Sequence, residues 1–160
     1  MKLRLIAVGL GALALIAPAG SSAGPARVAK NFHMSATMTP QQVVTLQSKP
    51  WKVPASVKNA KGNLTGTMPS NGGQIAWKIT FSGLGSSTVK VAAIHLGKPG
   101  QFGPVLAQLC SPCKSGAHGT AKLMAGQSSQ MSTGNAYVTL TTSKYPLGVV
   151  RGLLHALLRG

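Results

Sequence analysis

The sequence predicts an all-β protein, an antiparallel β-sandwich of about eight strands with Greek-key-like connections, formed as one domain. Short segments rich in Val, Ile and Thr recur along the 160 residues, and clusters of Gly, Pro, Asn and Ser separate them. Turn signals about every 8–12 residues are typical of sandwiches and barrels. Residues 75–81 also alternate strictly between apolar and polar side chains. Ile75, Trp77 and Ile79 share one face of this segment, so we expect a strand with one buried face.

Most of the expected strands are segments rich in β-branched residues that end at a turn signal. The eight strands are predicted at 32–38, 62–68, 75–81, 89–96, 104–109, 120–124, 136–142 and 148–157. Two short segments, 39–45 and 125–133, favour a helix. Residues 48–61 contain two prolines and four lysines, which predict a long irregular loop, and residues 114–119 are predicted to form a turn.

The first 23 residues are predicted to be a secretory signal peptide. Lys2 and Arg4 precede an apolar run over residues 5–17, and small residues follow it. This order of positive, apolar and small residues is the pattern of an export signal. Cleavage is expected after Ala23, with Ala19 as the alternative, and an uncleaved membrane anchor is the other interpretation of this segment.

The expected domain organisation follows from this signal. Residues 1–23 form the signal peptide, 24–31 a flexible leader and 32–160 a single β-sandwich domain. The apolar run is shorter than the roughly 18 residues needed to span a bilayer, and no other segment of the sequence is apolar enough to do so. We therefore expect a periplasmic or secreted protein without a transmembrane span after signal cleavage.

The chain contains 16 Lys and Arg residues and neither Asp nor Glu, which gives a formal net charge of +16. Side-chain carboxylates are therefore excluded as general bases, nucleophiles, metal ligands and ion-pair partners. Acid denaturation arises mainly from protonating carboxylates that are paired in the native state. We expect the stability to change little between about pH 5 and pH 2, which favours adaptation to an acidic medium outside the cytoplasm.

The positive charge has a second interpretation, which is binding to nucleic acid, anionic lipid or an acidic polysaccharide. The lysines are spread evenly along the chain, and few aromatic side chains are present for stacking on bases. We therefore expect no specific binding of nucleic acid. Acid adaptation and binding of an anionic surface polymer remain the two interpretations.

Cys110 and Cys113 form a Cys-Ser-Pro-Cys segment. Because an exported protein meets an oxidising environment, a disulfide is the expected state of this pair. Two alternatives stay open: a redox-active pair, and a copper or zinc site that combines both sulfurs with His95 or His118. The spacing lacks a second pair of ligands, so no cofactor is expected, with copper or zinc as the alternative.

Two motifs in a fixed order give the chain a resemblance to a known family. The first lies between Ile94 and Val105, and the second between Tyr137 and Gly152. The residues that carry the resemblance are His95, Gly97, Gly103, Pro104, Tyr137, Pro146, Gly148, Arg151 and Gly152. In these motifs the chain resembles the CHRD domain, a module named after chordin and widespread in bacterial exported proteins. The resemblance covers roughly residues 32–154 and implies a β-sandwich.

The chain departs from the family pattern at its most polar positions. Ala93 replaces the first His of the family's His-x-His, and Thr141 replaces the His of the second motif. Thr139 stands at an Asn position and Val149 at a Glu position. The resemblance therefore implies a degraded site. For His95 we weigh a surviving metal ligand or proton carrier against a strand histidine that is hydrogen-bonded at the rim of the sheet.

Arg151 lacks the acidic neighbour of the family motif, so it is expected to bond backbone carbonyls, to point to solvent or to bind an anion. No catalytic triad is visible because no carboxylate can orient a histidine, and we expect no enzyme. The sequence predicts an exported, non-catalytic module with a structural or binding role in the cell envelope, serving an envelope or extracellular partner. A periplasmic copper- or zinc-binding protein and a cationic module that binds anionic surface polymer are the alternatives.

Overall fold

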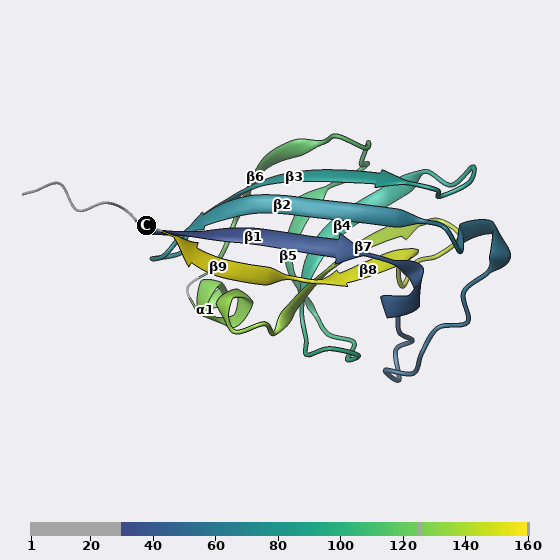
Figure 1. Cartoon of the computed structure of the whole chain (residues 1–160), viewed down its shortest axis with the longest axis horizontal. Helices are drawn as coiled ribbons and strands as arrows, with labels where there is room; N and C mark the ends of the chain where they lie inside the picture. Colours follow the sequence, from purple (N-terminus) through teal and green to yellow (C-terminus); the bar gives the residue numbers. More distant parts are fainter. Residues whose placement is uncertain (1–29, 125, 160) are drawn as a thin grey trace, which may run out of the picture.

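The computed structural model describes residues 30–124 and 126–159, in which nine strands form two antiparallel sheets (Figure 1). The order in the five-stranded sheet is β6 (His118–Lys122), β3 (Gln74–Ser82), β2 (Lys61–Pro69), β1 (Asn31–Met38) and β9 (His155–Arg159). The order in the four-stranded sheet is β5 (Val105–Cys110), β4 (Val89–Leu96), β7 (Ala136–Thr142) and β8 (Val150–Leu153). The predicted all-β sandwich is confirmed.

The last predicted strand, 148–157, consists of two strands that belong to different sheets. β8 pairs with β7, whereas β9 pairs with β1. Between them Leu154 is buried and its N–H donates to the carbonyl of Ala136, so the chain passes from one sheet to the other at this residue. An apolar segment carries no sign of such a crossing in its periodicity, which is why the pattern predicted a single strand.

β6 begins at His118, two residues before the predicted strand at 120–124 and inside the predicted turn at 114–119. Glycine is a turn signal, but Gly119 pairs with Trp77 across the sheet. A Cβ at Gly119 would lie 3.2 Å from Cζ2 of that indole ring. This glycine therefore serves close packing within a strand, and the predicted turn was too long.

Helical structure in the described ranges is limited to three short elements. The 3-10 helix η1 (Pro40–Gln42) and the helix α1 (Gln127–Ser132) fall inside the two segments that were predicted to be helical. The 3-10 helix η2 (Ala55–Val57) lies in the segment predicted to be irregular. None of the described helices combines the length and the hydropathy needed to cross a bilayer.

The N-terminal segments predicted from the sequence fall largely outside the described residues. The expected signal peptide, 1–23, and residues 24–29 of the expected leader both lie there. Asn31, the last residue of that leader, is already the first residue of β1 and pairs with Pro69. The described strands therefore begin one residue before the predicted start of the domain.

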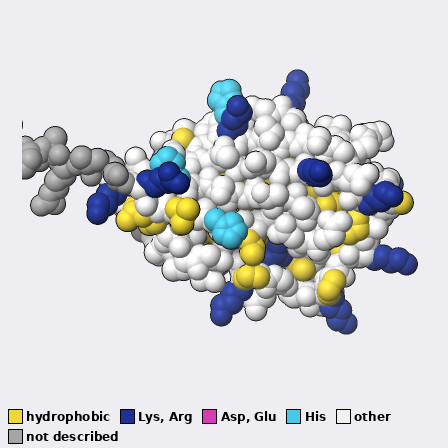
Figure 2. Space-filling model, viewed as in Figure 1, with side chains coloured by type: hydrophobic (Ala, Val, Ile, Leu, Met, Phe, Trp, Pro, Cys, Tyr) yellow, Lys and Arg dark blue, Asp and Glu magenta, His cyan; other side chains and the backbone are white. Residues whose placement is uncertain are grey.

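The core lies between the two sheets and contains inward side chains from both. Representative core residues, each 0% exposed, are Leu64, Ile75 and Ile79 from one sheet and Ile94, Val138 and Leu140 from the other. The alternation predicted for residues 75–81 is confirmed, because Lys78 and Thr80 are exposed on the opposite side of β3. That outer side of the five-stranded sheet faces the viewer in Figures 1 and 2.

β7 departs from the simple alternation of an outer strand. Its residues are buried from Ala136 to Leu140, including Tyr137 and Thr139, which point away from the core. The segment that joins β4 to β5 bonds to Tyr137 and lies over this side of the sheet. The two sheets therefore differ: part of the outer side of the four-stranded sheet is covered by a segment of the first motif, and polar and aromatic motif residues lie beneath it.

Candidate functional site

The motif residues with polar or aromatic side chains meet on the outer side of the four-stranded sheet, which we name the covered face. Residues two apart on a strand share one side of a sheet. His95 on β4 pairs directly with Tyr137 on β7, and Thr139 on β7 pairs with Arg151 on β8. The register therefore places one side chain from each of the two strands that flank β7 beside two side chains of β7.

Three of these side chains form a stack with the phenol ring of Tyr137 at its centre. The His95 imidazole lies parallel to that ring, with 5.0 Å between ring centroids and 9° between planes. The Cζ atom of Arg151 lies 3.5 Å from the centroid of the same ring. Since β4 and β8 flank β7 on opposite sides, the phenol separates the imidazole from the guanidinium. A cation over an aromatic face is an attractive arrangement.

Both ring nitrogens of His95 have partners. Nδ1 lies 3.1 Å from the carbonyl oxygen of Gly103, and Nε2 lies 3.0 Å from the hydroxyl of Thr139. Because a carbonyl can only accept, Nδ1 carries the hydrogen, and in the neutral ring Nε2 accepts from the Thr139 hydroxyl. Burial lowers the pKa of His95, the bond to Gly103 raises it, and the charge of Arg151 lowers it further, with a net lowering. The network thus favours the neutral imidazole over the protonated one.

Tyr137 and Arg151 attach the residues 97–104, the motif loop, to the covered face. The Tyr137 hydroxyl accepts from the N–H of Gly103 at 2.9 Å and donates to its carbonyl at 3.3 Å. The Nη2 atom of Arg151 donates to the carbonyls of Gln101 at 2.7 Å and of Lys98 at 3.3 Å. Each of these hydrogen bonds is to the backbone of the motif loop. The polar motif residues therefore hold the loop against the sheet.

Arg151 is a buried cation, only 3% exposed, in a chain whose sequence contains no side-chain carboxylate. Its charge is stabilised instead by two carbonyl dipoles and by the face of Tyr137. Burial lowers its pKa and the nearby Tyr137 raises it, with a net lowering. Of the three placements expected for this residue, the structure shows the one in which it bonds backbone carbonyls.

The motif glycines and prolines shape the connections around these side chains. Gly97, Gly103 and Pro104 belong to the motif loop, Pro146 and Gly148 to the connection between β7 and β8, and Gly152 to β8. Gly103 has no room for a side chain, because a Cβ there would overlap the carbonyl oxygen of Leu96. The N–H of Leu96 in turn donates to the carbonyl of Pro104 at 2.9 Å. This closure brings the Gly103 peptide within reach of His95 and Tyr137.

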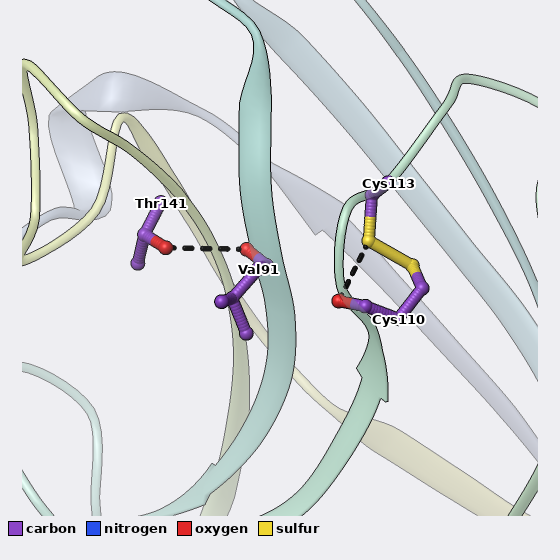
Figure 3. Close-up of a disulfide and its surroundings, with 4 residues drawn as sticks. All are labelled: Val91, Cys110, Cys113 and Thr141. Carbon is purple, nitrogen blue, oxygen red and sulfur yellow. Dashed lines mark hydrogen bonds between the residues drawn. A yellow bond between two sulfur atoms is a disulfide. The ribbon is translucent and has the colours of Figure 1, made fainter.

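The disulfide predicted for Cys110 and Cys113 is confirmed (Figure 3). Cys113 is buried, and its N–H donates to the carbonyl of Val89 at 3.1 Å, so the cross-link ties the end of β5 to the start of β4. Figure 3 also shows Thr141, which stands at a family His position, donating from its hydroxyl to the carbonyl of Val91 at 3.4 Å.

The four residues considered for copper or zinc are not brought together. The two cysteines are paired as a disulfide and offer no thiolate. His95 lies on the covered face, whereas His118 is exposed on β6 of the other sheet, where it pairs with Lys78. Within the described ranges no three His, Cys, Asp or Glu residues gather into a group able to hold a metal ion.

Sequence reasoning did not foresee the roles of Thr139 and Tyr137. Thr139 was regarded only as a lost Asn, although its hydroxyl completes the hydrogen bonding of His95. The available signal was the pairing of β4 with β7, because alternation places His95 and Tyr137 on the same side of the sheet once their register is known.

The comparison with family models agrees with this geometry. The model described as the CHRD domain matches residues 34–154, which includes every residue of the stack and of the motif loop. No curated protein and no solved structure matches the chain. A CHRD domain is a β-sandwich module that fits a non-catalytic role in structure or binding. The two sheets, the motif order and the family model together lead to one conclusion: the chain belongs to the CHRD domain family.

Proposed function

We propose that this protein is an exported, non-catalytic CHRD module with a structural or binding role in the cell envelope, adapted to acidic surroundings. The observation that carries the proposal is the use of the motif side chains. His95, Tyr137 and Arg151 all form hydrogen bonds with the backbone of the motif loop, and His95 also bonds to Thr139. Side chains that are engaged in this way build a surface and hold it, which is what a binding or structural module requires.

A catalytic role for His95 has little support in this geometry. A general base needs a free ring nitrogen within hydrogen-bonding distance of its substrate, but both nitrogens are engaged by Gly103 and Thr139. A metal ligand needs a lone pair that is equally free. Copper or zinc binding by the reduced chain, through Cys110, Cys113 and a histidine, stays a prediction.

The acid adaptation is supported by the composition. With no Asp or Glu in 160 residues, acid has no paired side-chain carboxylate to protonate, and the linkage between pH and stability disappears where the native and unfolded states bind equal numbers of protons. One group modifies this rule. The pKa of His95 is lowered by burial in the folded state, so the unfolded chain takes up its proton first as the pH falls.

Thermal unfolding between pH 8 and pH 2 tests this proposal. Stability should fall as the pH drops through the ordinary histidine value of about 6.5, because the unfolded state then binds more protons than the folded state. It should level off once the pH lies below the lowered pKa of His95 and stay level from there to pH 2. A steep loss of the melting temperature below pH 5 in the His95→Gln variant, which lacks this group, would overturn the acid adaptation.

Export and metal binding are tested together by the native mass of the untagged chain purified from an exporting host, with copper and zinc offered. The expected product starts at Gly24, lacks both thiol protons and carries no metal. A chain that retains residues 1–23 would overturn the proposed export, and a stoichiometric metal on a reduced chain would replace the proposed role with metal handling.

A further inference from the structure

The outer side of the five-stranded sheet, which we name the open face, is an uncovered and mostly polar surface. Its register places a row of side chains across all five strands: His118, Lys78, Thr65, Ser35 and His155. Neighbouring strands lie about 4.8 Å apart, so this row spans about 19 Å. Each member of the row is exposed.

The ionisable groups of the open face are all basic. Lys61, Lys78, Lys122 and Arg159 contribute permanent charge, and three of the four histidines in the chain add to them: His33, His118 and His155. Figure 2 shows histidine and Lys or Arg side chains on this face, some of them side by side, amid a mostly white surface of backbone and uncharged polar side chains, with hydrophobic groups toward its lower and right-hand parts. With no carboxylate in the sequence, these cations have no side-chain partner of opposite charge within the chain.

Two shallow hollows combine these cations with hydroxyl, amide and aromatic groups. One, of about 400 Å³, is lined by Lys61 together with Asn63, Thr80 and Phe81. The other, of about 370 Å³, is lined by His33 and Lys78 together with Thr65, Thr67 and Trp77. Both lie over β1, β2 and β3, so a ligand that crosses these strands would meet a cation and hydroxyl groups in each hollow.

We propose that the open face binds an acidic polysaccharide and that acid strengthens this binding through His33, His118 and His155. Lysine and protonated imidazole suit the sulfate or carboxylate groups of such a polymer. The Thr, Ser and Asn side chains between them suit its sugar hydroxyls. The inference rests on the non-catalytic binding role proposed above, for which it names a partner and a surface.

Two other polyanions fit this face less well. Proteins that lie on anionic membranes usually bury Trp, Phe or Leu among the lipids, and proteins that bind single-stranded nucleic acid stack bases on aromatic rings. The aromatic side chains of β1 and β3, namely Phe32, Trp77 and Phe81, belong to or pack against the core. Trp77 and Phe81 line the two hollows, but Trp77 is only 6% exposed and Phe81 is half-buried, so neither projects from the face. Leu157, on the edge strand β9, is the one large exposed apolar side chain on the described open face.

The pH dependence follows from the charges that surround the three histidines. His118 lies beside Lys78, and Lys122 follows four residues later on the same strand. His33 lies diagonally across from both His155 and Arg159 and lines a hollow with Lys78. The helix α1, which packs beside β9, carries no ionisable side chain. Histidine side chains become protonated in acid, which adds positive charge to that of the four Lys and Arg side chains on this face. A bound polyanion favours that protonation.

The experiment measures affinity for dextran sulfate, whose charge does not change in this pH range, at pH 7.5 and pH 5.0 in fixed salt, with neutral dextran as the reference. The full chain is compared with two triple variants of equal net charge. One carries Lys61→Gln, Lys78→Gln and Lys122→Gln on the open face. The matched control carries Lys52→Gln, Lys90→Gln and Lys98→Gln, all exposed and all outside the five-stranded sheet.

The open-face lysine variant should lose about tenfold in affinity at pH 5.0 relative to its matched control. The native chain should bind about tenfold more tightly at pH 5.0 than at pH 7.5. A third variant, His33→Gln, His118→Gln and His155→Gln, should lose this pH dependence while it keeps the affinity measured at pH 7.5. Equal losses in the two lysine variants, or an unchanged pH dependence in the histidine variant, would overturn the inference.

Vesicles that contain anionic lipid provide the last comparison. Tighter binding to these vesicles than to dextran sulfate, at equal anion concentration, would show that the ligand of the open face is an anionic membrane and would overturn the proposed polysaccharide binding. Equal binding to neutral dextran would overturn the role of charge. These failures are distinguishable from failure of the proposed function. If the acid melting profile is as expected but the chain does not bind dextran sulfate, only the polysaccharide inference is overturned. The melting temperatures of all variants, measured alongside, show that they are folded.

Discussion

The two outer faces of this sandwich use histidine and basic side chains in opposite ways. On the covered face a histidine, a tyrosine and an arginine are stacked and hydrogen-bonded under the motif loop. On the open face three histidines and several lysines are exposed to solvent. The two faces differ because the motif loop covers one of them and not the other. Polar groups buried under the loop need hydrogen-bond partners, and the loop backbone supplies them. Family motif residues can therefore serve stability on one side while the other side remains available to a partner.

The largest expected effect of a single substitution is at Arg151. Arg151→Met keeps much of the side-chain volume but removes the donor to the carbonyls of Gln101 and Lys98, together with the cation over Tyr137. We expect a loss of about 3 kcal/mol in the free energy of unfolding, measured by urea denaturation. Lys78→Met, at an exposed position of the open face, is the control and should change the stability by less than about 0.5 kcal/mol. Equal effects at the two positions would erase the distinction between the faces.

The disulfide provides a test of stability that involves neither the motif loop nor the open face. Replacing both Cys110 and Cys113 with Ser removes a cross-link between residues three apart. The loop-entropy relation gives an expected loss of about 2 kcal/mol. Urea denaturation of the double variant measures it, and dextran sulfate affinity should stay unchanged. A variant that loses affinity as well would show that the cross-link shapes the binding surface.

A smaller loss is expected for Tyr137→Phe, which keeps the ring of the stack and removes its hydroxyl. The N–H of Gly103 then loses its acceptor, and the carbonyl of Gly103 keeps only His95. We expect a loss of about 1–2 kcal/mol in unfolding free energy. Hydrogen exchange should report faster exchange at Gly103 than in the native chain. An unprotected Gly103 amide in the native chain would contradict the bond itself.

The smallest effect concerns the pH dependence of stability. Because burial lowers the pKa of His95 in the folded state, stability decreases as the pH falls through about 6.5 and levels off below the lowered value. His95→Gln removes this group and should flatten the profile of melting temperature against pH between about 8 and 5. A variant profile that keeps the slope of the native chain would contradict the assignment to His95.

The sequence predicted the strands well where alternation and turn signals coincide. The strand predicted at 89–96 has the observed bounds of β4, and residues 75–81 lie within β3 with the predicted side inward. Prediction failed where a single contact decides the path of the chain. Leu154 sends β8 and β9 to different sheets, and Gly119 makes room for Trp77. Such contacts depend on elements distant in sequence and leave no periodic signal.

The sequence identified the residues of the candidate site but not how they are arranged relative to one another. The motif residues His95, Tyr137 and Arg151 were identified, but their meeting depends on the register of three strands. The open face illustrates the same point more strongly. Its histidines lie 37 residues apart between His118 and His155 and look scattered along the chain, yet the pairing of β6, β3, β2, β1 and β9 places them in one row with Lys78.

The most direct test of this account is a map of backbone amide shifts in the ¹⁵N-labelled chain as dextran sulfate is added at pH 5. If the covered face is structural and the open face binds, the shifts will concentrate on β1, β2 and β3, around Thr65, Lys78 and Thr80. The amides of the motif loop and of Arg151 will stay in place. Shifts concentrated on residues 97–104 and on β8 would contradict the account and return the binding role to the covered face.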